Sequence, residues 1–559
     1  MIFSSPFPDI QLQEMDVYHY LFDNPKIEAL PNVPALVDGI SSRTVTRGEM
    51  GRFARQFAHV LAHHYHWRSQ EVAAILSPNS VEYPSLLLGL LAVGGVATTA
   101  NPAYSATEFA NQLKDSEARL ILTVPELLPK AIEAAKMASL NPHKDILLVH
   151  HPDHPEHASH THLPSLYALL TPQEYQPIRL QPHEIWDRTA YLVYSSGTSG
   201  LPKGVRVTHG NIVSNSQQKS ASEGPTPAGE VWGGVLPFYH IYGLVIVLHC
   251  SFSRGIPVIV VPKFDFTQFL ELIAKYRMTM CHVAPPICLA LAKHPAVPKY
   301  DLSSMRSVIS GAGPLDGDLV QLIKERTGIL VRQGYGMSEA SPLVTLAPEL
   351  DSPAGSSGLL VPNMLAKVVA LDGTLQGVGG EGELWIKGPN ITAGYWKNPR
   401  ATAEAIDADG FLHTGDVVRR DERGHFYIVD RIKELIKYKG FQVAPAEIEA
   451  LLLSHKEIDD VAVIGVMDPK LATEVPRAYV VRKPGSSLTK EVVAAFVAGQ
   501  LSEHKQLRGG VHFTNTIPKS GAGKILRRLL RDAAKATTTI PSSSSTPPQS
   551  LVAAPSSKL

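Results

Sequence analysis

Short apolar runs alternate with longer amphipathic stretches from residue 30 to about residue 430. Each short run is bounded by turn residues, and this arrangement is typical of strands that are buried in a layered protein. Clear examples are VAAIL (72–76), ARLILTV (118–124), DILLVHH (145–151) and IPVIVVP (256–262). The alternation predicts a layered α/β core.

The longest apolar run extends from Leu86 to Ala97. A helix needs ~20 apolar residues to cross a bilayer, so this run predicts no membrane span. Its glycines, Gly89, Gly94 and Gly95, suit a helix that packs tightly in a core. We therefore expect one buried helix over this run.

The pattern changes around residues 373–388, where glycine turns separate short strand-like segments such as GVGGEGELWIKG. This texture predicts a β-rich subdomain. The DRIK segment at 430–433 then leads into a stretch of mixed α/β character. Because 559 residues are too many for one ordinary core, we expect two or more domains.

The composition is that of a globular protein, with 44% apolar and 19% charged residues. The formal net charge is zero and the pI is about 7.4, so charge gives no reason to expect nucleic acid or an anionic membrane as a partner. Three widely placed cysteines, Cys250, Cys281 and Cys288, imply no disulfide framework. We expect each of them to be buried and unreactive.

The stretch YLVYSSGTSGLPKGV contains the most informative loop of the chain. The apolar residues Tyr191 to Tyr194 run into residues rich in Ser, Thr and Gly that end with Lys203 and Gly204. Glycines let backbone N–H groups turn inward, and hydroxyls and a lysine add donors for phosphate oxygens. Between a strand and a helix such a loop predicts a polyphosphate site. Lys203 is followed by Gly204 rather than by Ser or Thr, so the loop is not a Walker A motif.

The SSGTSGLPKGV segment resembles the signature of the adenylate-forming superfamily, which groups acyl- and aryl-CoA synthetases, firefly luciferase and peptide-synthetase adenylation domains. Further segments agree in the family's order: GYGMSEASP (334–342), the triplet TGD (414–416), DRIKELIKYKGFQVAPAEIE (430–449) and PKSGAGKILRR (518–528). The branch that holds plant 4-coumarate:CoA ligase is the most similar. The resemblance implies a large N-terminal layered α/β domain (1–430) with the acyl and ATP sites, and a small mobile α+β domain (431–533).

The implied reaction has two steps, because a carboxylate is a poor acylating agent. ATP converts the acid into an acyl-adenylate and pyrophosphate, and CoA then displaces AMP to give the acyl-CoA. The first step needs donors for phosphates, a divalent cation and a lysine near the reacting oxygens. The resemblance implies an ATP site made of Ser195, Ser196, Gly197, Thr198, Ser199, Gly200, Lys203, Gln333, Gly334, Ser338, Asp416, Arg431 and Lys433.

Within that site, Glu339 is expected to hold Mg²⁺, which favours carboxylate oxygen. Lys524 is implied to be the lysine of the adenylation step, and His240 to close over the acyl site. The IKYKGFQ segment serves the thiol step in relatives, which implies that Lys437 and Gln442 act there. The same resemblance implies that Lys439 and Gly440 contact CoA. It also implies that the small domain rotates about Lys433 between the two steps.

The resemblance places the acyl pocket at Ile241, Tyr242, Val245, Ile246, Ile309, Gly311, Ala312, Gly336, Pro342 and Leu343. Plant coumarate ligases carry polar residues where this chain has Val245, Ile246 and Ile309. A buried hydroxyl without a partner costs roughly 1–3 kcal/mol. We therefore expect a weakly hydroxylated aryl acid or an aliphatic acid to be preferred over 4-coumarate.

The residues from 534 to 559 are rich in Ser and Pro and are expected to be a disordered tail. The tail ends in Ser557, Lys558 and Leu559, the tripeptide read by the peroxisomal import receptor. A histidine-rich stretch at 149–164 has a composition that can bind metal, but its prolines, acidic residues and irregular spacing favour a solvated loop.

Three other functions compete with a CoA ligase. A luciferase-like oxygenase shares the family motifs, and light output with luciferin, ATP and oxygen distinguishes it. A stand-alone adenylating enzyme could load a carrier protein, although no carrier-like domain follows residue 530. A non-catalytic binding protein is disfavoured because every expected chemical position is filled.

Overall fold

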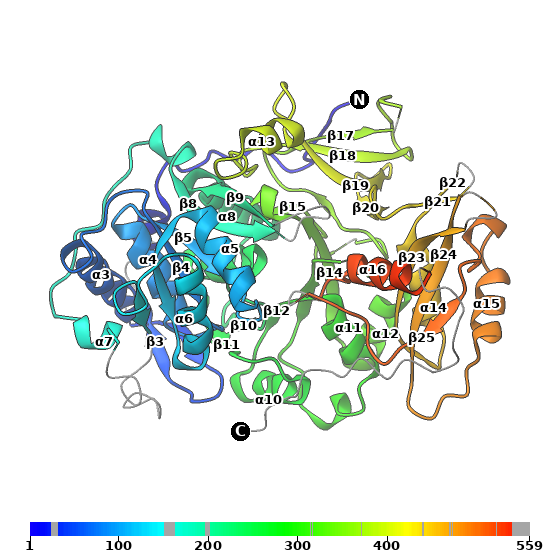
Figure 1. Ribbon diagram of the computed structural model, residues 1–559, viewed down its shortest axis with the longest axis horizontal. Helices are drawn as coiled ribbons and strands as arrows, with labels where there is room; N and C mark the ends of the chain where they lie inside the picture. The colour runs from blue at the N-terminus through cyan, green and yellow to red at the C-terminus, as the bar shows by residue number, and fades with distance from the viewer. Residues whose placement is uncertain are drawn as a thin grey trace.

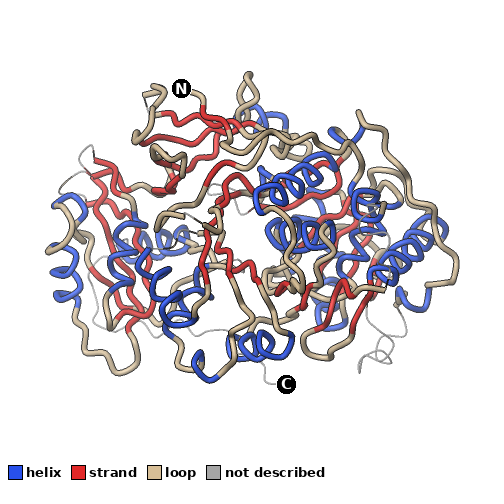
Figure 2. Tube along the Cα trace, turned by 180° about the vertical axis from the view of Figure 1, so that it is seen from behind, coloured by secondary structure: helices blue, strands red, loops and turns tan. Residues whose placement is uncertain are grey.

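The computed structural model describes residues 1–23, 32–149, 163–195, 202–313, 315, 317–350, 352–370, 372–438, 441–468, 471, 473–520 and 523–538. Figure 1 shows the elements that follow β20 gathered at one end of the long axis, and Figure 2 shows the same arrangement from behind. The predicted α/β fold with a β-rich part and a smaller C-terminal part is confirmed.

The first sheet is formed by β4 (Val72–Leu76), β5 (Val96–Ala100), β6 (Ala118–Thr123), β7 (Ile146–Leu148), β8 (Thr189–Ser195) and β9 (Lys203–Thr208). Its order is β7-β6-β4-β5-β8-β9, and all neighbours are parallel except β8 and β9. Alternate side chains of β4 enter different cores, since Ile75 belongs to one cluster and Ala74 to another. The first cluster includes α3 (Arg47–His63) and α4 (Tyr83–Ala92), and the second α5 (Ala106–Ser116) and α6 (Leu128–Met137).

The second sheet has the order β16-β15-β14-β13-β12-β10-β11-β2-β3 and is parallel from β14 to β2. Its strands are β2 (Pro34–Asp38), β3 (Thr44–Thr46), β10 (Trp232–Gly234), β11 (Val258–Val260), β12 (Met280–Val283), β13 (Ser307–Ser310), β14 (Leu330–Gly336), β15 (Leu343–Leu346) and β16 (Leu359–Leu360). One core joins this sheet to α10 (Phe266–Tyr276), α11 (Pro285–Lys293) and α12 (Gly317–Thr327). The other joins it to α8 (His209–Glu223), the π-helix η4 (Tyr242–His249) and α9 (Cys250–Ser253).

The third sheet is antiparallel, in the order β1-β17-β18-β19-β20. Its strands are β1 (Phe3–Ser4), β17 (Leu365–Val369), β18 (Glu381–Lys387), β19 (Leu412–Arg420) and β20 (Phe426–Arg431). In β18, buried and more exposed residues alternate, as expected for a sheet with one solvated face. The glycine-rich region predicted to be β-rich lies in this sheet.

The C-terminal part contains a hairpin of β21 (Ile436–Tyr438) and β22 (Phe441–Val443), and a sheet in the order β23-β24-β25. That sheet consists of β23 (Ile458–Asp468), β24 (Thr473–Arg482) and β25 (Val511–Phe513). The helices of this part are α14 (Pro445–Ser454), α15 (Lys490–Ala498) and α16 (Arg527–Thr538). It has its own core, in which α14 and α15 contribute Ile448 and Val493.

The remaining elements are short. They are α1 (Val17–Phe22), η1 (Pro125–Leu127), α7 (Leu166–Leu169), η3 (Glu184–Trp186), η5 (Val297–Lys299), η6 (Ser338–Ala340), α13 (Pro399–Ala405) and η7 (Glu503–Lys505). Among the described residues, none of the helices has the length and apolarity that crossing a membrane requires. All three cysteines are buried and free, as predicted.

The structure corrects two details of the sequence prediction. The run from Leu86 to Ala97 is not one helix, because α4 ends at Ala92 and β5 begins at Val96. Gly94, with φ of 69°, makes the turn between them. The phosphate loop does not join a strand to a helix but joins β8 to β9, with Ser195 opposite Lys203. The segment from Lys203 to Thr208 alternates apolar and polar residues, which is the pattern of a strand.

Candidate active site

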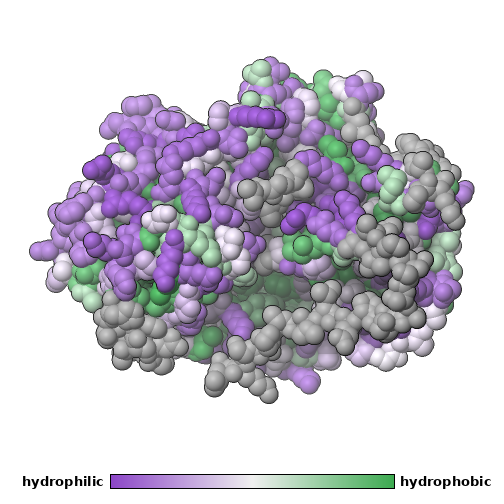
Figure 3. All heavy atoms as spheres, in the orientation of Figure 1, coloured by the Kyte–Doolittle hydropathy of each residue, from purple (hydrophilic) through white to green (hydrophobic). Residues whose placement is uncertain are grey.

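The candidate active site lies where β13 and β14 end, which is the usual position of ligands in parallel α/β sheets. A narrow pocket there is lined by Lys219, His240, Ile241, Tyr242, Ile246, His282, Ile309, Gly311, Ala312, Gly334, Tyr335, Gly336, Met337, Pro342, Leu343 and Leu346. A Cβ atom on Gly311 would lie 2.7 Å from Cε1 of Tyr242, so glycine is needed where the chain approaches that ring. In Figure 3 the molecular surface is hollowed near its middle, with apolar residues at the floor.

The pocket contains every residue that we predicted for the acyl site except Val245. Val245 is fully buried in the core, whereas its neighbour Ile246 faces the pocket. Adjacent residues of a helix point in different directions, and here Ile246 rather than Val245 faces the cavity. The prediction for Val245 is therefore wrong.

Sequence reasoning missed five residues of the lining: Lys219, His282, Tyr335, Met337 and Leu346. Lys219 belongs to α8, a helix rich in polar residues that is nevertheless buried. The side-chain amides of α8 donate to main-chain carbonyls of other segments. For example, Asn215 Nδ2 donates to Leu343 O at 2.9 Å. From its polar composition, α8 would be predicted to be a surface helix. For this reason the sequence did not indicate that Lys219 lines the pocket.

A polar group from the middle of β19 and the end of β20 borders the pocket. Asp416 and Arg431 are opposite each other in these strands, with Arg431 Nε 3.2 Å from Asp416 Oδ1. Tyr335, which lines the pocket, donates its hydroxyl to Asp416 Oδ2 at 2.6 Å. Asp416 is 5% exposed, so its carboxylate is held in place by two partners rather than by water. This fixed acceptor suits the hydroxyls of a ribose.

A second polar group connects the end of the phosphate loop to η6. The hydroxyl of Tyr395 donates to Oε1 of the buried Glu339 at 2.9 Å, and Lys203 Nζ lies 5.0 Å from the centre of the Tyr395 ring. Burial, and then the charge of Glu339, raise the pKa of Tyr395. Glu339 lies next to Ser338, which is also buried. Tyr395 thus connects Lys203 to Glu339, and Ser338 adjoins Glu339 in η6.

Lys524 approaches the same site from the C-terminal part. It follows Gly523, whose φ is 79°, and the turn is closed by a bond from Ser520 N to Lys524 O at 2.8 Å. Burial, and then the charge of Arg431, lower the pKa of Lys524 to about 8, while Asp416 acts in the opposite direction. Burial and the charge of Lys524 also lower the pKa of His240 to about 4. The charge of Lys524 therefore acts on Asp416 and Arg431 and on His240, which lines the pocket.

Lys437 occupies a different place. It is exposed in the middle of β21, where its N–H donates to Glu474 Oε2 at 2.8 Å. Its strand partner in β22 is Gln442, of which only the main chain is described. Lys433 is an exposed turn residue between β20 and β21. The structure therefore brings one of the two predicted lysines, Lys524, to the site and leaves the other at the surface.

Two predicted nucleotide-site residues precede η6. Gln333 is buried in β14 and its side chain accepts from Leu315 N at 2.9 Å, while Gly334 lines the pocket. Several other predicted residues lie outside the described part of the chain: Ser196, Gly197, Thr198, Ser199, Gly200, Lys439, Gly440, Ser557, Lys558 and Leu559. The same holds for the side chain of Ser195 and for residues 150–162 of the histidine-rich stretch. In the part that is described, no group of three or more His, Cys, Asp or Glu residues could hold a metal ion.

Comparison with known proteins identifies the family. The AMP-binding enzyme family model matches residues 25–396, and the model of its C-terminal domain matches residues 447–524. The chain belongs to this family of adenylate-forming enzymes. It is 38% identical to the probable 4-coumarate–CoA ligase 1 of Dictyostelium discoideum over 542 residues, which cover 95% of this chain and 97% of that one. It is 37% identical to 4-coumarate–CoA ligase 1 of Solanum tuberosum over 544 residues, or 95% and 96% of the two chains.

A solved structure agrees with this assignment. ATP-bound MatB from Rhodopseudomonas palustris superposes with a TM-score of 0.83 at 28% identity, covering 93% of this chain and 99% of that one. The fold and the sequence relatives together support ATP-dependent ligation of an acid to CoA. This adenylate-forming enzyme is therefore an AMP-forming acid–thiol ligase.

Proposed function

We propose that this ligase forms its acyl-adenylate in the pocket at the ends of β13 and β14, with Lys524 as the lysine of that step. The observation that carries the proposal is that the charge of Lys524 acts both on His240, which lines the pocket, and on the Asp416–Arg431 pair, which is bonded to the lining residue Tyr335. A buried ammonium stabilises negative charge as the carboxylate oxygen attacks the α-phosphate and pyrophosphate leaves. Asp416 accepts from the ribose, and the loop that ends at Lys203 holds the outer phosphates.

The test of this function is AMP release by the purified protein with MgATP, CoA and a panel of carboxylic acids. We expect AMP and acyl-CoA to appear in equal amounts for at least one acid. Release of AMP that requires no CoA and gives no thioester, with an acylated carrier protein as the product, would favour the carrier-loading alternative instead. Light emission with luciferin and oxygen would favour the oxygenase.

Glu339 suits a magnesium ion that arrives with ATP. Its carboxylate is buried and accepts one hydrogen bond, from Tyr395 at Oε1. Mg²⁺ is usually held by one or two carboxylates, phosphates and water rather than by a cage of protein ligands. When bound, the ion offsets the charge of the phosphates. We expect Glu339→Gln to raise the Mg²⁺ concentration needed for half-maximal AMP release by about tenfold, since one charged ligand is lost.

The second step needs a different arrangement of the C-terminal part. Lys437, Lys439 and Gly440 belong to the segment between β20 and β22, and Lys437 is remote from the pocket lining. We propose that a rotation about Lys433 withdraws Lys524 and brings this segment to the adenylate for attack by the CoA thiol. The separate locations of Lys524 and Lys437 support this proposal.

We also propose import into the peroxisome through the last three residues, Ser557, Lys558 and Leu559. The sequence of these residues is the support. A fluorescent protein fused in front of the full chain is expected to enter peroxisomes, and the same fusion ending at Ser556 is expected to remain outside. Import of both fusions would show that the tripeptide is not the signal.

A further inference from the structure

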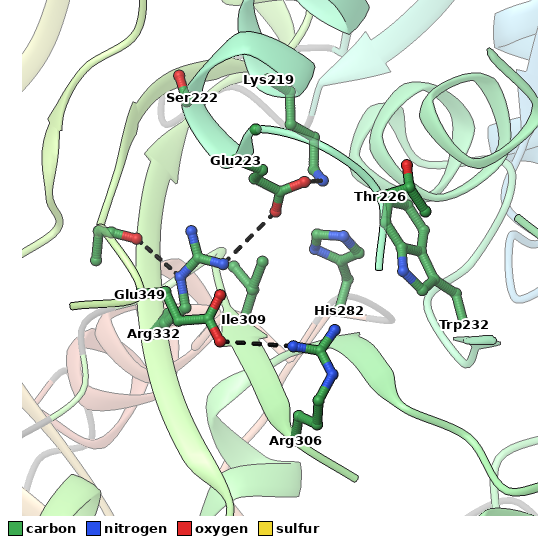
Figure 4. A network of polar contacts seen from close by, with 12 residues as sticks. Lys219, Ser222, Glu223, Thr226, Trp232, His282, Arg306, Ile309, Arg332 and Glu349 are labelled. Carbon is green, nitrogen blue, oxygen red and sulfur yellow. Dashed lines mark hydrogen bonds and ion pairs between the residues drawn. The ribbon is translucent and has the colours of Figure 1, made fainter. Parts of the chain in front are cut away.

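One end of the acyl pocket is charged. Lys219 lines the pocket from α8 with 1% exposure, and its Nζ lies 2.6 Å from Oε2 of Glu223, one helical turn later. Nζ also lies 4.5 Å from the centre of the Trp232 ring. Figure 4 shows Lys219, Glu223, His282 and Trp232 gathered around this end. A buried lysine is costly unless it is paired, so its presence in an acyl pocket needs an explanation.

Positive charge is in excess at this end. The carboxylate of Glu223 is contacted by Lys219 and also by Arg254 Nη1 at 2.5 Å and Arg332 Nη1 at 3.7 Å. Burial alone would raise the pKa of Glu223, but these three cations lower it to about 2. One carboxylate thus faces three cations, all of them nearly buried.

The next carboxylate does not correct this imbalance. Glu230 is buried beside Trp232, but its Oε2 lies 2.6 Å from Arg306, which brings a further positive charge. Arg306 is half exposed and also meets Glu349 at 3.5 Å (Figure 4). Among the described residues, four cations and three carboxylates thus meet in this region, which leaves one positive charge in excess.

His282 adds an unpartnered polar atom to the same end. The Tyr242 hydroxyl donates to Ile309 O at 3.1 Å, so its oxygen accepts from His282 Nδ1 at 3.2 Å. This assigns the proton of the neutral ring to Nδ1 and leaves a lone pair on Nε2. Nε2 is buried and has no hydrogen-bond partner among the described residues, although His282 lines the pocket.

The charged end is separated from His240 by the length of Tyr242. The main-chain N–H of Tyr242 donates to His240 Nδ1 at 3.3 Å, whereas its hydroxyl meets His282 Nδ1 at 3.2 Å. His282 and Lys219 line the pocket together with His240. An acid whose carboxylate reacts near His240 therefore extends its far end toward Lys219, and an apolar far end would leave the excess charge without compensation.

We propose that Lys219 forms a subsite for an anionic far end of the substrate, so that the ligase selects dicarboxylic acids, aliphatic or aryl, over monocarboxylic acids of the same length. This inference rests on the ligase function proposed above. The second carboxylate accepts from the Lys219 ammonium and neutralises the excess charge around Glu223. A dicarboxylic acid thus takes the place of the fatty acid or weakly hydroxylated aryl acid that we expected from Val245, Ile246 and Ile309 alone.

A carboxylate fits this end better than a hydroxyl. A hydroxyl could bridge Lys219 and His282 Nε2, because it both accepts and donates. It would leave the excess positive charge unchanged, however, whereas an anion removes it. Charged hydrogen bonds are also roughly twice as strong as neutral ones.

The test compares three matched series of linear acids from butanoate to decanoate: unsubstituted, ω-hydroxy and ω-carboxy. The measurement is kcat/KM for AMP release with MgATP and CoA. We expect the ω-carboxy acid to exceed the unsubstituted acid of the best length by about tenfold to a hundredfold, the effect of one charge-assisted hydrogen bond. A preference for the unsubstituted series would refute the subsite, and a preference for the ω-hydroxy series would refute its anionic specificity.

Lys219→Met removes the charge while keeping the length of the side chain. We expect it to lose the preference for the ω-carboxy acid, measured as the ratio of kcat/KM for the ω-carboxy and the unsubstituted acid. Lys275→Met is the matched control, because Lys275 also lies over a ring, that of Tyr276 at 4.7 Å, but at the surface. An unchanged preference in Lys219→Met would overturn the role of Lys219.

If Lys219→Met does not fold, the comparison of the three acid series with the wild-type enzyme still tests the anionic subsite. A different result would refute the proposed ligase function: no acid of any series would release AMP. Release of AMP from unsubstituted acids without a gain from the second carboxylate would leave the ligase function intact and reject only the subsite.

Discussion

Lys524 is the residue whose setting most directly links the structure to the chemistry. The turn that presents it ends at Gly523, where an added Cβ would lie 3.2 Å from Cδ of Pro286 in α11, so the turn is pressed against the large part of the molecule. Its neighbours Arg431 and Asp416 have opposite charges. The lysine is thus buried between charges of opposite sign.

Lys524→Ala is expected to slow acyl-adenylate formation by about a hundredfold to a thousandfold, the usual effect of removing one electrostatic stabiliser of a transition state. Pyrophosphate release in a single turnover measures this step. The reaction of a supplied acyl-adenylate with CoA should remain close to normal, because we propose that Lys437 serves that step. Lys519→Ala is the control, since Lys519 lies in the same segment but pairs with Asp460 at 2.6 Å. Equal loss of both steps in Lys524→Ala would contradict a role restricted to adenylation.

The pH dependence of the first step should report the same lysine. The pKa of Lys524 is lowered to about 8, so the ammonium is present below that pH and is lost above it. We expect kcat/KM for ATP to fall on the alkaline side with a midpoint near pH 8, because this parameter reports the free enzyme. Bound ATP is negative and raises the pKa, so the midpoint for kcat should lie at higher pH. In Lys524→Arg the alkaline fall should disappear from the residual activity, since guanidinium stays charged.

At the scale of elements, α4 shows how close packing fixes the frame around the site. A Cβ on Gly89 would lie 2.6 Å from Cδ1 of Phe57 and 2.8 Å from the carbonyl oxygen of Ala54, both in α3. We expect Gly89→Ala to destabilise the protein by about 1–3 kcal/mol through overpacking. Gly377→Ala is a suitable control, because no atom lies within 4 Å of its Cβ position. Denaturant unfolding measures both, and equal stability of the two variants would show that the α3–α4 contact relaxes without cost.

The sequence predicted correctly those elements whose hydrophobic pattern fits only one type of secondary structure. The runs at 72–76 and 118–124 are apolar on both faces and form β4 and β6, because helices cover both sides of that sheet. The β8–β9 hairpin was not predicted. The Ser, Thr and Gly composition of the loop suggested a connection from a strand to a helix, although Lys203 to Thr208 form a strand.

Other misses have a common physical cause, which is that burial is set by tertiary packing. The polar helix α8 is buried because its amides bond to distant carbonyls, so Lys219 reaches the pocket. His282 is buried in a strand whose neighbours are apolar, and nothing local marks it as pocket-lining. The motif residues Glu339, Asp416 and Lys524, by contrast, were predicted because the resemblance names them one by one.

At the scale of the whole molecule, the structure matches one of the two arrangements that we propose for the reaction. The charge of Lys524 acts on groups at the pocket and Lys437 is at the surface, which is the arrangement that we propose for adenylation. The C-terminal part is held against the large part by contacts that are easily broken, such as the bond from Lys293 Nζ to Leu453 O at 3.2 Å. Small contacts of this kind suit a domain that rotates between two positions.

Lys433 lies in the turn between β20 and β21, at the position expected for the hinge. Proline there fixes φ and also restricts Ile432, so Lys433→Pro should hinder the rotation without touching the pocket. Because Lys524 is already in place, we expect acyl-adenylate formation in a first turnover to stay near normal while acyl-CoA release slows by at least about tenfold. Lys433→Ala is the control, since it removes the charge and keeps the backbone free. Rapid-quench measurement of pyrophosphate and thioester separates the two steps. If Lys433→Pro forms both products at the normal rate, the rotation does not occur at this residue. If Lys433→Ala is as slow as Lys433→Pro, the side chain rather than the backbone is responsible.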